Sequence, residues 1–98
     1  MNKEKIIRNN LEIQEKLSKT LLKNHCLGAF IVLLDSGREL ELEYNKISFS
    51  ITRHEEKLFM NIEESQSYNN AYELLLHAKI DNQYLIDIWD NTKIIVLF

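Results

Sequence analysis

The sequence predicts a single α+β domain that spans residues 1–98. Between Arg38 and Glu63, apolar and polar residues alternate with a period of two, which is typical of strands that bury one face. Residues 3–24 and the segment after Asn70 instead carry apolar residues at helical spacing. From these observations we expect an N-terminal helix packed on a four- to five-stranded antiparallel meander, followed by two short C-terminal helices and a final strand.

Length and composition are those of one globular domain. The chain has 98 residues, of which 45% are hydrophobic and 28% charged, so it can bury one core. The longest nearly uncharged apolar run, Cys26–Leu34, is far shorter than the ~20 residues of a membrane helix. The first residues lack the apolar core of a secretory signal, and Cys26 has no second cysteine to pair with. We expect a cytoplasmic protein without a membrane partner, in which Cys26 is a small buried apolar residue.

The N-terminal helix is predicted over residues 3–24. Its apolar residues cover about half of the helix circumference. They are Ile6, Ile7, Leu11, Ile13, Leu17, Leu21 and Leu22. A stripe of this width can cover one face of a sheet, and it can also form the seam of a homodimer. The sequence leaves both uses open.

The middle of the chain is expected to form a meander of four strands joined by short links. The strands are Ala29–Leu34, Arg38–Tyr44, Ile47–Thr52 and Lys57–Glu63. The first is a continuous apolar run of β-branched and bulky residues, which favours a buried central strand. Gly37 then supplies the left-handed residue of a three-residue hairpin loop, and Asn45 suits the tight turn that follows the second strand.

The C-terminal third returns to helical spacing. Asn70, followed three residues later by a glutamate, fits the N-cap of a short helix over residues 71–78. Asp81 is a second candidate N-cap, and the helix after it is expected to end near Asp90. The apolar run Lys93–Phe98 then predicts a final strand that joins the sheet or packs under the helices.

The net charge of −3 conceals an uneven distribution. Residues 1–25 contain six basic and three acidic residues, whereas residues 26–98 contain six basic and twelve acidic ones. An acidic body disfavours nucleic acid as a partner, because phosphate backbones bind clustered cations. We interpret the basic side of the first helix as a solvated face.

The sequence contains no recognisable reactive constellation. Glycine-rich phosphate loops and nucleophile elbows are absent. His25 and Cys26 are sequence neighbours, and neighbours on a strand point to opposite faces. The His-Glu-Glu cluster at residues 54–56 falls in a predicted turn and has no further ligands at metal-binding spacing. We therefore expect neither catalysis nor a metal or other cofactor.

A row of acidic residues is the strongest candidate for a binding site. Glu39, Glu41 and Glu43 alternate with apolar residues and so share the polar face of one predicted strand. Two interpretations fit this row. It can keep an exposed face soluble and discourage pairing at a sheet edge, or it can dock a partner that has a basic surface.

Other acidic and aromatic residues can extend this surface. The acidic ones, provided that the last helices lie nearby, are Glu63, Glu64, Asp87 and Asp90. By alternation, Phe59 lies on the polar side of its strand, while Tyr68 and Tyr72 flank the cap of the first short C-terminal helix. Exposed aromatic side chains at such positions are frequent anchors in protein interfaces.

The segment Glu73–Asp90, ELLLHAKIDNQYLIDIWD, resembles a phrase in small Firmicute immunity (antitoxin) proteins of polymorphic or LXG-type toxin systems. The shared pattern is a helix, then AKIDxxxLxxIWD, then a closing apolar strand, all within the C-terminal quarter of the chain. The resemblance implies a cytoplasmic α+β protein that binds and blocks a cognate protein toxin. It also implies that the protein has no catalysis of its own.

The sequence thus favours a non-enzymatic protein-binding module with an acidic docking face. A phage-encoded inhibitor, such as an anti-CRISPR protein, is one alternative, since such proteins are also small, acidic and α+β. A homodimeric structural or scaffolding protein, held by helix 3–24 or by the last strand, is the alternative from another class. An enzyme would require a deep pocket lined by His54 or His77.

Overall fold

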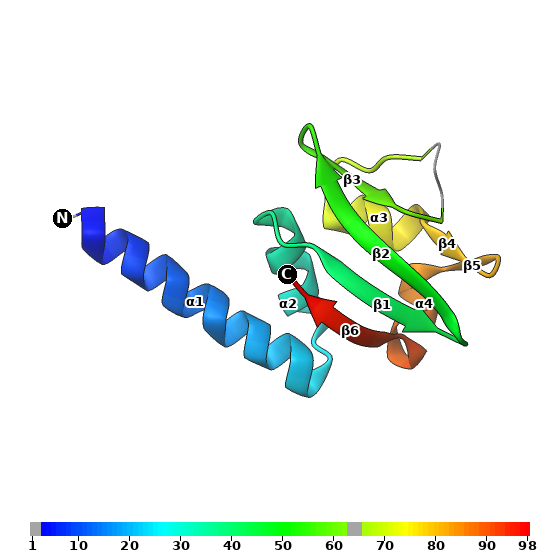
Figure 1. Cartoon of the computed structure of the whole chain (residues 1–98), viewed down its shortest axis with the longest axis horizontal. Helices are drawn as coiled ribbons and strands as arrows, with labels where there is room; N and C mark the ends of the chain where they lie inside the picture. Colours follow the sequence, from blue (N-terminus) through cyan, green and yellow to red (C-terminus); the bar gives the residue numbers. More distant parts are fainter. Residues whose placement is uncertain (1–2, 63–65) are drawn as a thin grey trace.

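The fold is α+β, as the sequence predicts. The computed structural model describes residues 3–62 and 66–98, and the side chains of residues 12–13, 15–62 and 66–98. In chain order the elements are α1 (Lys3–Asn24), α2 (Leu27–Asp35), β1 (Leu40–Tyr44), β2 (Ile47–His54), β3 (Lys57–Met60), α3 (Ala71–His77), β4 (Lys79–Ile80), β5 (Gln83–Tyr84), α4 (Leu85–Ile88), the 3₁₀ turn η1 (Trp89–Asn91) and β6 (Lys93–Leu97). Figure 1 shows a sheet with helices gathered behind it and α1 extending to one side.

Four strands form one antiparallel sheet in the order β3-β2-β1-β6. The predicted strands at 38–44, 47–52 and 57–63 are neighbours in the sheet, as expected, although β3 ends at Met60. Glu63, the predicted end of the last of these strands, lies outside the described residues. The final strand joins the sheet beside β1, which is one of the two positions expected for it.

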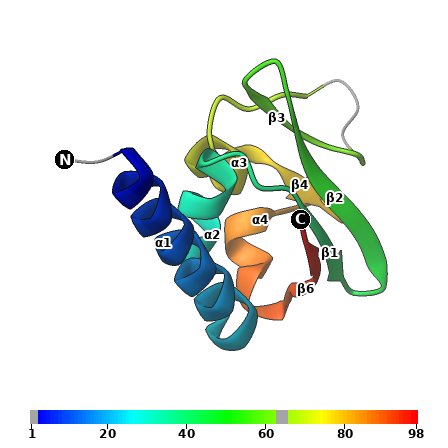
Figure 2. The same ribbon diagram turned by 60° about the vertical axis from the view of Figure 1, so that its left-hand side comes forward.

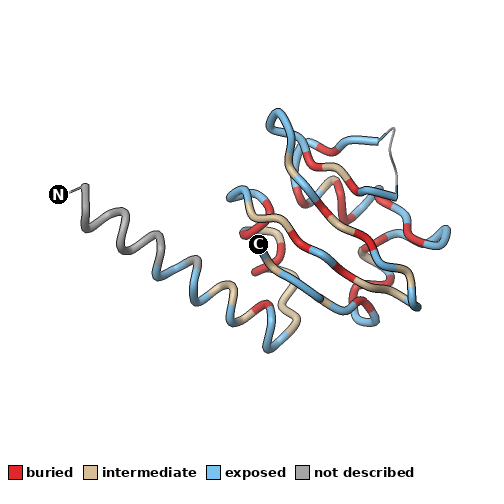
Figure 3. The backbone as a smooth tube through the Cα atoms, viewed as in Figure 1, coloured by how far each residue is buried: buried red, intermediate tan, exposed pale blue. Residues whose placement is uncertain are grey.

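The alternation in the sequence determines which side chains face the core. The inward-facing residues of β1, β2 and β3 are buried, and they are Leu40, Leu42, Phe49, Ile51, Leu58 and Met60. Their neighbours Glu41, Ser48 and Thr52 are exposed, and Figure 3 shows buried and exposed segments alternating along β1 and β2. Each buried side chain of this size contributes about 1.5–3 kcal/mol. A one-residue slip would expose them all, so their burial fixes the register.

The helices lie on one side of the sheet. Figure 2 shows α2, α3 and α4 between α1 and the sheet. These three helices bury apolar residues against the inner face of the sheet, among them Phe30, Leu33, Leu74 and Leu85. In the described part of the chain, no helix crosses the opposite face (Figures 1 and 2). The sheet therefore has one covered face and one open face.

The first helix, α1, packs on α2. Leu21 is fully buried and Leu17 is partly buried, whereas Ile13 is 54% and Leu22 is 56% exposed. The N-terminal half of α1 extends beyond the body of the protein (Figure 1). The expected layer of helix on sheet is thus present, but α2, α3 and α4 supply it directly and α1 lies outside them.

The prediction of a strand at Ala29–Leu34 is wrong, because this segment forms the core of helix α2. Its buried residues, Ala29, Phe30, Leu33 and Leu34, recur at the spacing of one helix face. Val32, on the other side of the helix, is exposed. A short continuous apolar run does not distinguish a buried strand from a buried helix.

Gly37 ends α2 instead of forming the predicted hairpin loop. Its φ of 104° lies in the region that favours glycine. Gly37 N donates to Leu34 O at 3.1 Å, and Arg38 N donates to Leu33 O at 3.0 Å. This pair of hydrogen bonds is a Schellman motif, which satisfies carbonyl groups that the end of a helix leaves without partners.

The predicted cap of α3 is confirmed, and the predicted cap at Asp81 is wrong. The Asn70 side chain accepts a hydrogen bond from Glu73 N at 2.9 Å, while the Glu73 carboxylate accepts one from Asn69 N at 3.0 Å. Asp81 instead opens the two-residue turn between β4 and β5 and has a φ of 53°. An aspartate tolerates this left-handed conformation, and α4 begins only at Leu85.

The joint between α1 and α2 is fixed to the C-terminal part of the chain. The ring of His25 stacks on that of Trp89, with centroids 4.4 Å apart. His25 Nε2 donates to Trp89 O at 2.6 Å, and Trp89 Nε1 donates to His25 O at 3.1 Å. Cys26, next to this pair, is partly buried and packs against the core. The two reciprocal hydrogen bonds therefore orient α1 on the body of the protein.

Candidate functional site

The face of the main sheet away from the helices (Figure 1) is called the outer face below. It carries most of the predicted acidic row. Its side chains are Lys93, Ile95 and Val96 from β6, Glu41 and Glu43 from β1, Ser48, Ser50 and Thr52 from β2, and Lys57, Phe59 and Asn61 from β3 and the residue after it. All of these residues are exposed or half-buried. The outer face is thus a mixed polar surface with acidic residues on a central strand.

Glu39 has a structural role that the sequence did not predict. It is half-buried and precedes β1. Its Oε2 accepts a hydrogen bond from Arg53 N at 2.8 Å, and its carbonyl accepts one from Phe98 N at 2.8 Å. Glu39 thus joins the ends of β2 and β6 to β1. Because its carboxylate is already used within the fold, the acidic row offers a partner two residues rather than three.

Glu41 and Glu43 lie at the centre of the outer face. Glu41 is exposed and lies between Ser50 on β2 and Val96 on β6. Glu43 is half-buried and opposite Lys93 on β6. Among the residues that the structure describes, neither carboxylate forms an ion pair. The register therefore places a cation across from Glu43 but none across from Glu41.

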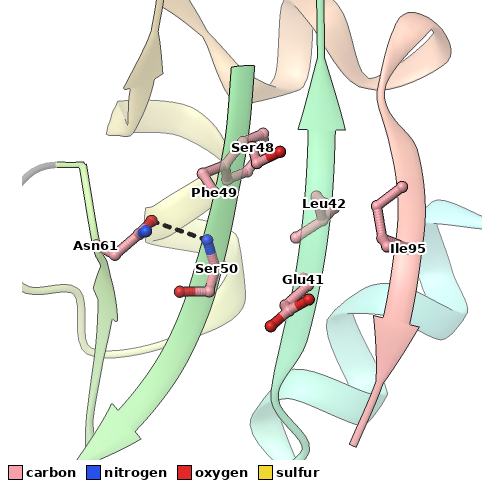
Figure 4. Close-up of a pocket in the computed structure, with 7 residues that line it drawn as sticks. All are labelled: Glu41, Leu42, Ser48, Phe49, Ser50, Asn61 and Ile95. Carbon is pink, nitrogen blue, oxygen red and sulfur yellow. Dashed lines mark hydrogen bonds between the residues drawn. The ribbon is translucent and has the colours of Figure 1, made fainter. Parts of the chain in front are cut away.

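A shallow, open depression of about 210 Å³ lies beside Glu41. It is lined by Glu41, Leu42, Ser48, Phe49, Ser50, Asn61 and Ile95. Figure 4 shows Glu41 between Ser50 and Ile95, with Asn61 on the far side of Ser50. The Asn61 side chain is held in place because its Oδ1 accepts a hydrogen bond from Ser50 N at 2.8 Å.

A β-bulge places Ile95 beside this depression. Val96 is opposite Glu41, and Ile94 is opposite Leu42, so Ile95 has no partner on β1. Bulges of this kind redirect a side chain and are frequent next to functional sites. Ile95 is 51% exposed as a result, and an apolar side chain therefore lies next to a carboxylate.

The predicted aromatic residues do not gather on the outer face. Phe59 is half-buried on this face, opposite Thr52. The expected exposure of Tyr68 is wrong: Tyr68 is buried and belongs to the hydrophobic core, and its backbone pairs with that of Leu58 through N–H···O bonds of 2.8 and 2.9 Å. Tyr72 is 62% exposed, as expected, but it belongs to α3, behind the sheet in Figure 1.

The acidic residues proposed to extend the row lie elsewhere or outside the described residues. Asp87 and Asp90 are exposed on α4 and η1, which lie on the helical side of the sheet (Figure 2). Glu63 and Glu64 fall between the two described ranges. Of the predicted partner-binding residues, the outer face brings together Glu41, Glu43 and Phe59.

The depression offers mainly hydrogen-bonding groups. Its lining supplies one carboxylate, two hydroxyls and one amide, but no histidine, lysine or cysteine that could activate a serine nucleophile. Across the described ranges, no group of three or more His, Cys, Asp or Glu is placed to hold a metal ion. His54 is at the exposed tip of the β2–β3 hairpin, 3.8 Å from Glu55 Oε1. No helix within those ranges is both long and apolar enough to cross a membrane.

Six of the seven residues that line the depression were not predicted as site residues, namely Leu42, Ser48, Phe49, Ser50, Asn61 and Ile95. Alternation already placed the two serines on the polar side of their strand, so that signal was available in the sequence. Ile95 carried no such signal, because the bulge that exposes it depends on how β6 pairs with β1.

In comparisons with known proteins, no protein-family model, no curated protein and no solved structure matches the chain. The geometry of the outer face is therefore the basis for assigning a function.

Proposed function

We propose that this chain is a non-enzymatic binding protein that attaches to a basic surface of another protein through the outer face of its sheet. One observation supports the proposal above all: the centre of this open face carries Glu41 and Glu43, which have no ion-pair partner among the described residues. Exposed carboxylates of this kind accelerate association with a basic partner and select against acidic ones.

The size and lining of the depression favour binding over catalysis. Its volume of about 210 Å³ is below the ~300–1,000 Å³ typical of pockets for small-molecule ligands. Glu41 is the one carboxylate in its lining, so the depression lacks the paired groups of acid–base chemistry. A protein surface that presses against an open face needs neither a deep pocket nor such a pair.

Within this proposal, the partner is a protein toxin and the chain is its cytoplasmic immunity protein. The resemblance of residues 73–90 to immunity proteins supports this assignment. A phage-encoded inhibitor, such as an anti-CRISPR protein, would use the same acidic face against a basic surface that normally binds nucleic acid. The neighbouring genes distinguish the two, because a toxin reading frame favours the first and a phage genome favours the second.

Charge reversal on the outer face tests the proposal. The wild-type chain and the variant Glu41→Lys/Glu43→Lys are immobilised and exposed to a lysate of the host. The matched control, Glu55→Lys/Glu56→Lys, makes the same change in charge at the exposed tip of the β2–β3 hairpin. The predicted partner is retained by the wild-type chain and by the control but lost by the outer-face variant.

The captured protein is then used in a rate measurement. For the outer-face variant we expect association at least about tenfold slower than for the wild-type chain, with a weaker dependence on ionic strength. The hairpin control should retain both the wild-type rate and its dependence on salt. Equal association rates for all three proteins would reject the outer face as the docking surface.

A homodimer is the second candidate function, and the exposed Ile13 on α1 favours it. Ile13 is 54% exposed, on a helix that extends beyond the body of the protein. Light scattering of the purified chain distinguishes the candidates, because a homodimer has twice the mass of one chain. If the mass is doubled, Ile13→Lys should restore the mass of a single chain. If the Ile13→Lys variant still has the doubled mass, α1 is excluded as the dimer seam.

A further inference from the structure

We infer that the depression beside Glu41 accepts a single arginine side chain of the partner protein. This inference rests on the proposed function, since it takes the outer face as the docking face, and it specifies the chemical group that the partner presents there. The partner is then a protein with an arginine that projects from a basic surface.

The depression extends across β1 and β2. From one side to the other it contains Asn61 just after β3, Ser50 on β2, Glu41 on β1 and the bulged Ile95 on β6 (Figure 4). Ser50 is opposite Glu41 in the register, and two hydrogen bonds, of 2.8 and 3.2 Å, join Ser50 to Asn61. Paired strands hold these groups in fixed positions, so an incoming side chain meets groups that need little reorganisation.

The polar side of the depression matches the donors of a guanidinium group. The Glu41 carboxylate has two oxygens, which a guanidinium binds through two parallel N–H···O bonds. The hydroxyls of Ser48 and Ser50 are further acceptors, and Asn61 Oδ1 has a second lone pair beyond the one used for Ser50 N. Because a guanidinium carries five donors in a planar fork and an ammonium only three, arginine satisfies this set of acceptors better than lysine does.

The apolar side of the depression matches the aliphatic stem of arginine. The bulge in β6 leaves Ile95 51% exposed, next to Glu41. Long cationic side chains bury their methylene groups on apolar surface while the charged end stays at a polar group. One arginine would therefore cover the exposed isoleucine and pair with the carboxylate at the same time.

The register identifies Glu41, rather than Glu43, as the counterion. Glu43 lies opposite Lys93, which already places a positive charge near its carboxylate, whereas the residues opposite Glu41 are Ser50 and Val96. The volume of about 210 Å³ is several times the roughly 30 Å³ that one water occupies in the liquid. The depression thus has room for the end of one side chain beside the carboxylate that lacks a cation.

An NMR titration of the full chain, labelled with ¹⁵N, tests this inference. The probe is the blocked peptide Gly-Gly-Arg-Gly-Gly, compared with the same peptide carrying lysine or the uncharged isostere citrulline in place of arginine. We expect saturable shifts at Ser48, Ser50, Asn61 and Ile95 with the arginine peptide, smaller shifts with lysine and none with citrulline. Shifts spread over the whole outer face, or equal shifts with citrulline, would overturn the inference.

Two matched variants localise the binding. Glu41→Gln is expected to lower the affinity for the arginine peptide about tenfold, because it removes the charge from the hydrogen-bond acceptor. Glu43→Gln makes the same change one position along the outer row and is expected to lower the affinity about twofold or less. Both residues lie on the surface, so neither change removes a core contact. Equal losses of affinity in the two variants would indicate that the arginine peptide is attracted by the overall negative charge of the outer face and not by a subsite at Glu41.

A second probe separates this inference from the proposed function. Hexalysine at low ionic strength should bind the wild-type chain and lose affinity for Glu41→Lys/Glu43→Lys. If hexalysine behaves in this way while the arginine peptide gives no localised shifts, the arginine subsite is rejected and the docking face stands. If hexalysine does not distinguish the wild-type chain from the charge-reversal variant, both proposals fail.

Ile95→Ser tests the apolar side of the depression. This variant should lower the affinity for the arginine peptide about threefold. An unchanged affinity would contradict the role of Ile95.

Discussion

Glu39 is expected to stabilise the fold, whereas Glu41, the next residue of the same row, is expected to be nearly neutral. The Glu39 carboxylate accepts the N–H of Arg53 at 2.8 Å in a half-buried position. A hydrogen bond to a charged group contributes about 1.5–3 kcal/mol, and partial exposure to solvent reduces it. We therefore expect Glu39→Ala to lower the free energy of unfolding by about 1–2 kcal/mol. For Glu41→Ala, on the exposed surface, we expect a change within about 0.5 kcal/mol.

Urea denaturation, followed by the fluorescence of the single tryptophan, Trp89, measures these differences. With a denaturant slope of about 1–1.5 kcal/mol per molar urea for a small domain, Glu39→Ala should lower the midpoint by about 1 M. Glu39→Gln is the matched control, because it retains an uncharged acceptor oxygen and should lose about half as much. Equal losses of stability in Glu39→Ala and Glu41→Ala would refute the distinct structural role of Glu39.

Three further changes test the backbone and the joint between α1 and α2. Glu55 and Glu56 have φ values of 50° and 65°, and this left-handed conformation costs an L-residue about 1–2 kcal/mol. Replacing the pair by Asn-Gly should therefore raise the free energy of unfolding by about 1–2 kcal/mol. An unchanged urea midpoint would contradict this. Trp89→Phe removes the hydrogen bond from the indole N–H to His25 O at the joint between α1 and α2, and it should lower Tm by about 5–10 °C. An unaltered Tm would mean that this hydrogen bond contributes nothing to stability. Gly37 has a φ of 104°, so Gly37→Ala should lower the free energy of unfolding by about 1–2 kcal/mol. Gly28→Ala should not lower it, because the added Cβ would lie 3.9 Å from the nearest atom, Cys26 Sγ. Similar losses of stability in both variants would disprove the special role of Gly37.

Strands β1, β2 and β3 could be predicted from the sequence because burial on one face imposes a strict period of two. Leu40, Leu42, Phe49 and Ile51 are all buried, and the polar residues between them are exposed or half-buried. The cap of α3 was also predictable, because a capping box depends on local hydrogen bonds at fixed offsets. Both features are determined by residues close together in the chain.

Helix α2 was missed because it is apolar on most of its circumference. In such a helix the contrast between buried and exposed positions is weak, and a run of this length fits a buried strand equally well. Two signals pointed to a helix. The buried pairs Ala29-Phe30 and Leu33-Leu34 are four residues apart, and Gly37 follows the run at the position of a helix C-cap glycine.

The candidate site was only partly predictable, because its shape depends on contacts between distant strands. Alternation placed Glu41 and Glu43 on the outer face, but it gave no reason to separate them from Glu39. That separation arises from a hydrogen bond to Arg53, fourteen residues away. The exposure of Ile95 likewise follows from a shift in register between β1 and β6. Pairwise geometry of this kind cannot be obtained from periodicity alone.

Mapping the bound partner by backbone amide NMR measures most directly which surface of the chain makes contact. With the ¹⁵N-labelled chain saturated by the protein that the wild-type bait captures, we predict that chemical-shift changes concentrate at Glu41, Glu43, Ser48 and Ser50 and remain small along α1. Changes concentrated on α1 or on the tip of the β2–β3 hairpin, with the outer face unaffected, would contradict an acidic docking surface on the sheet.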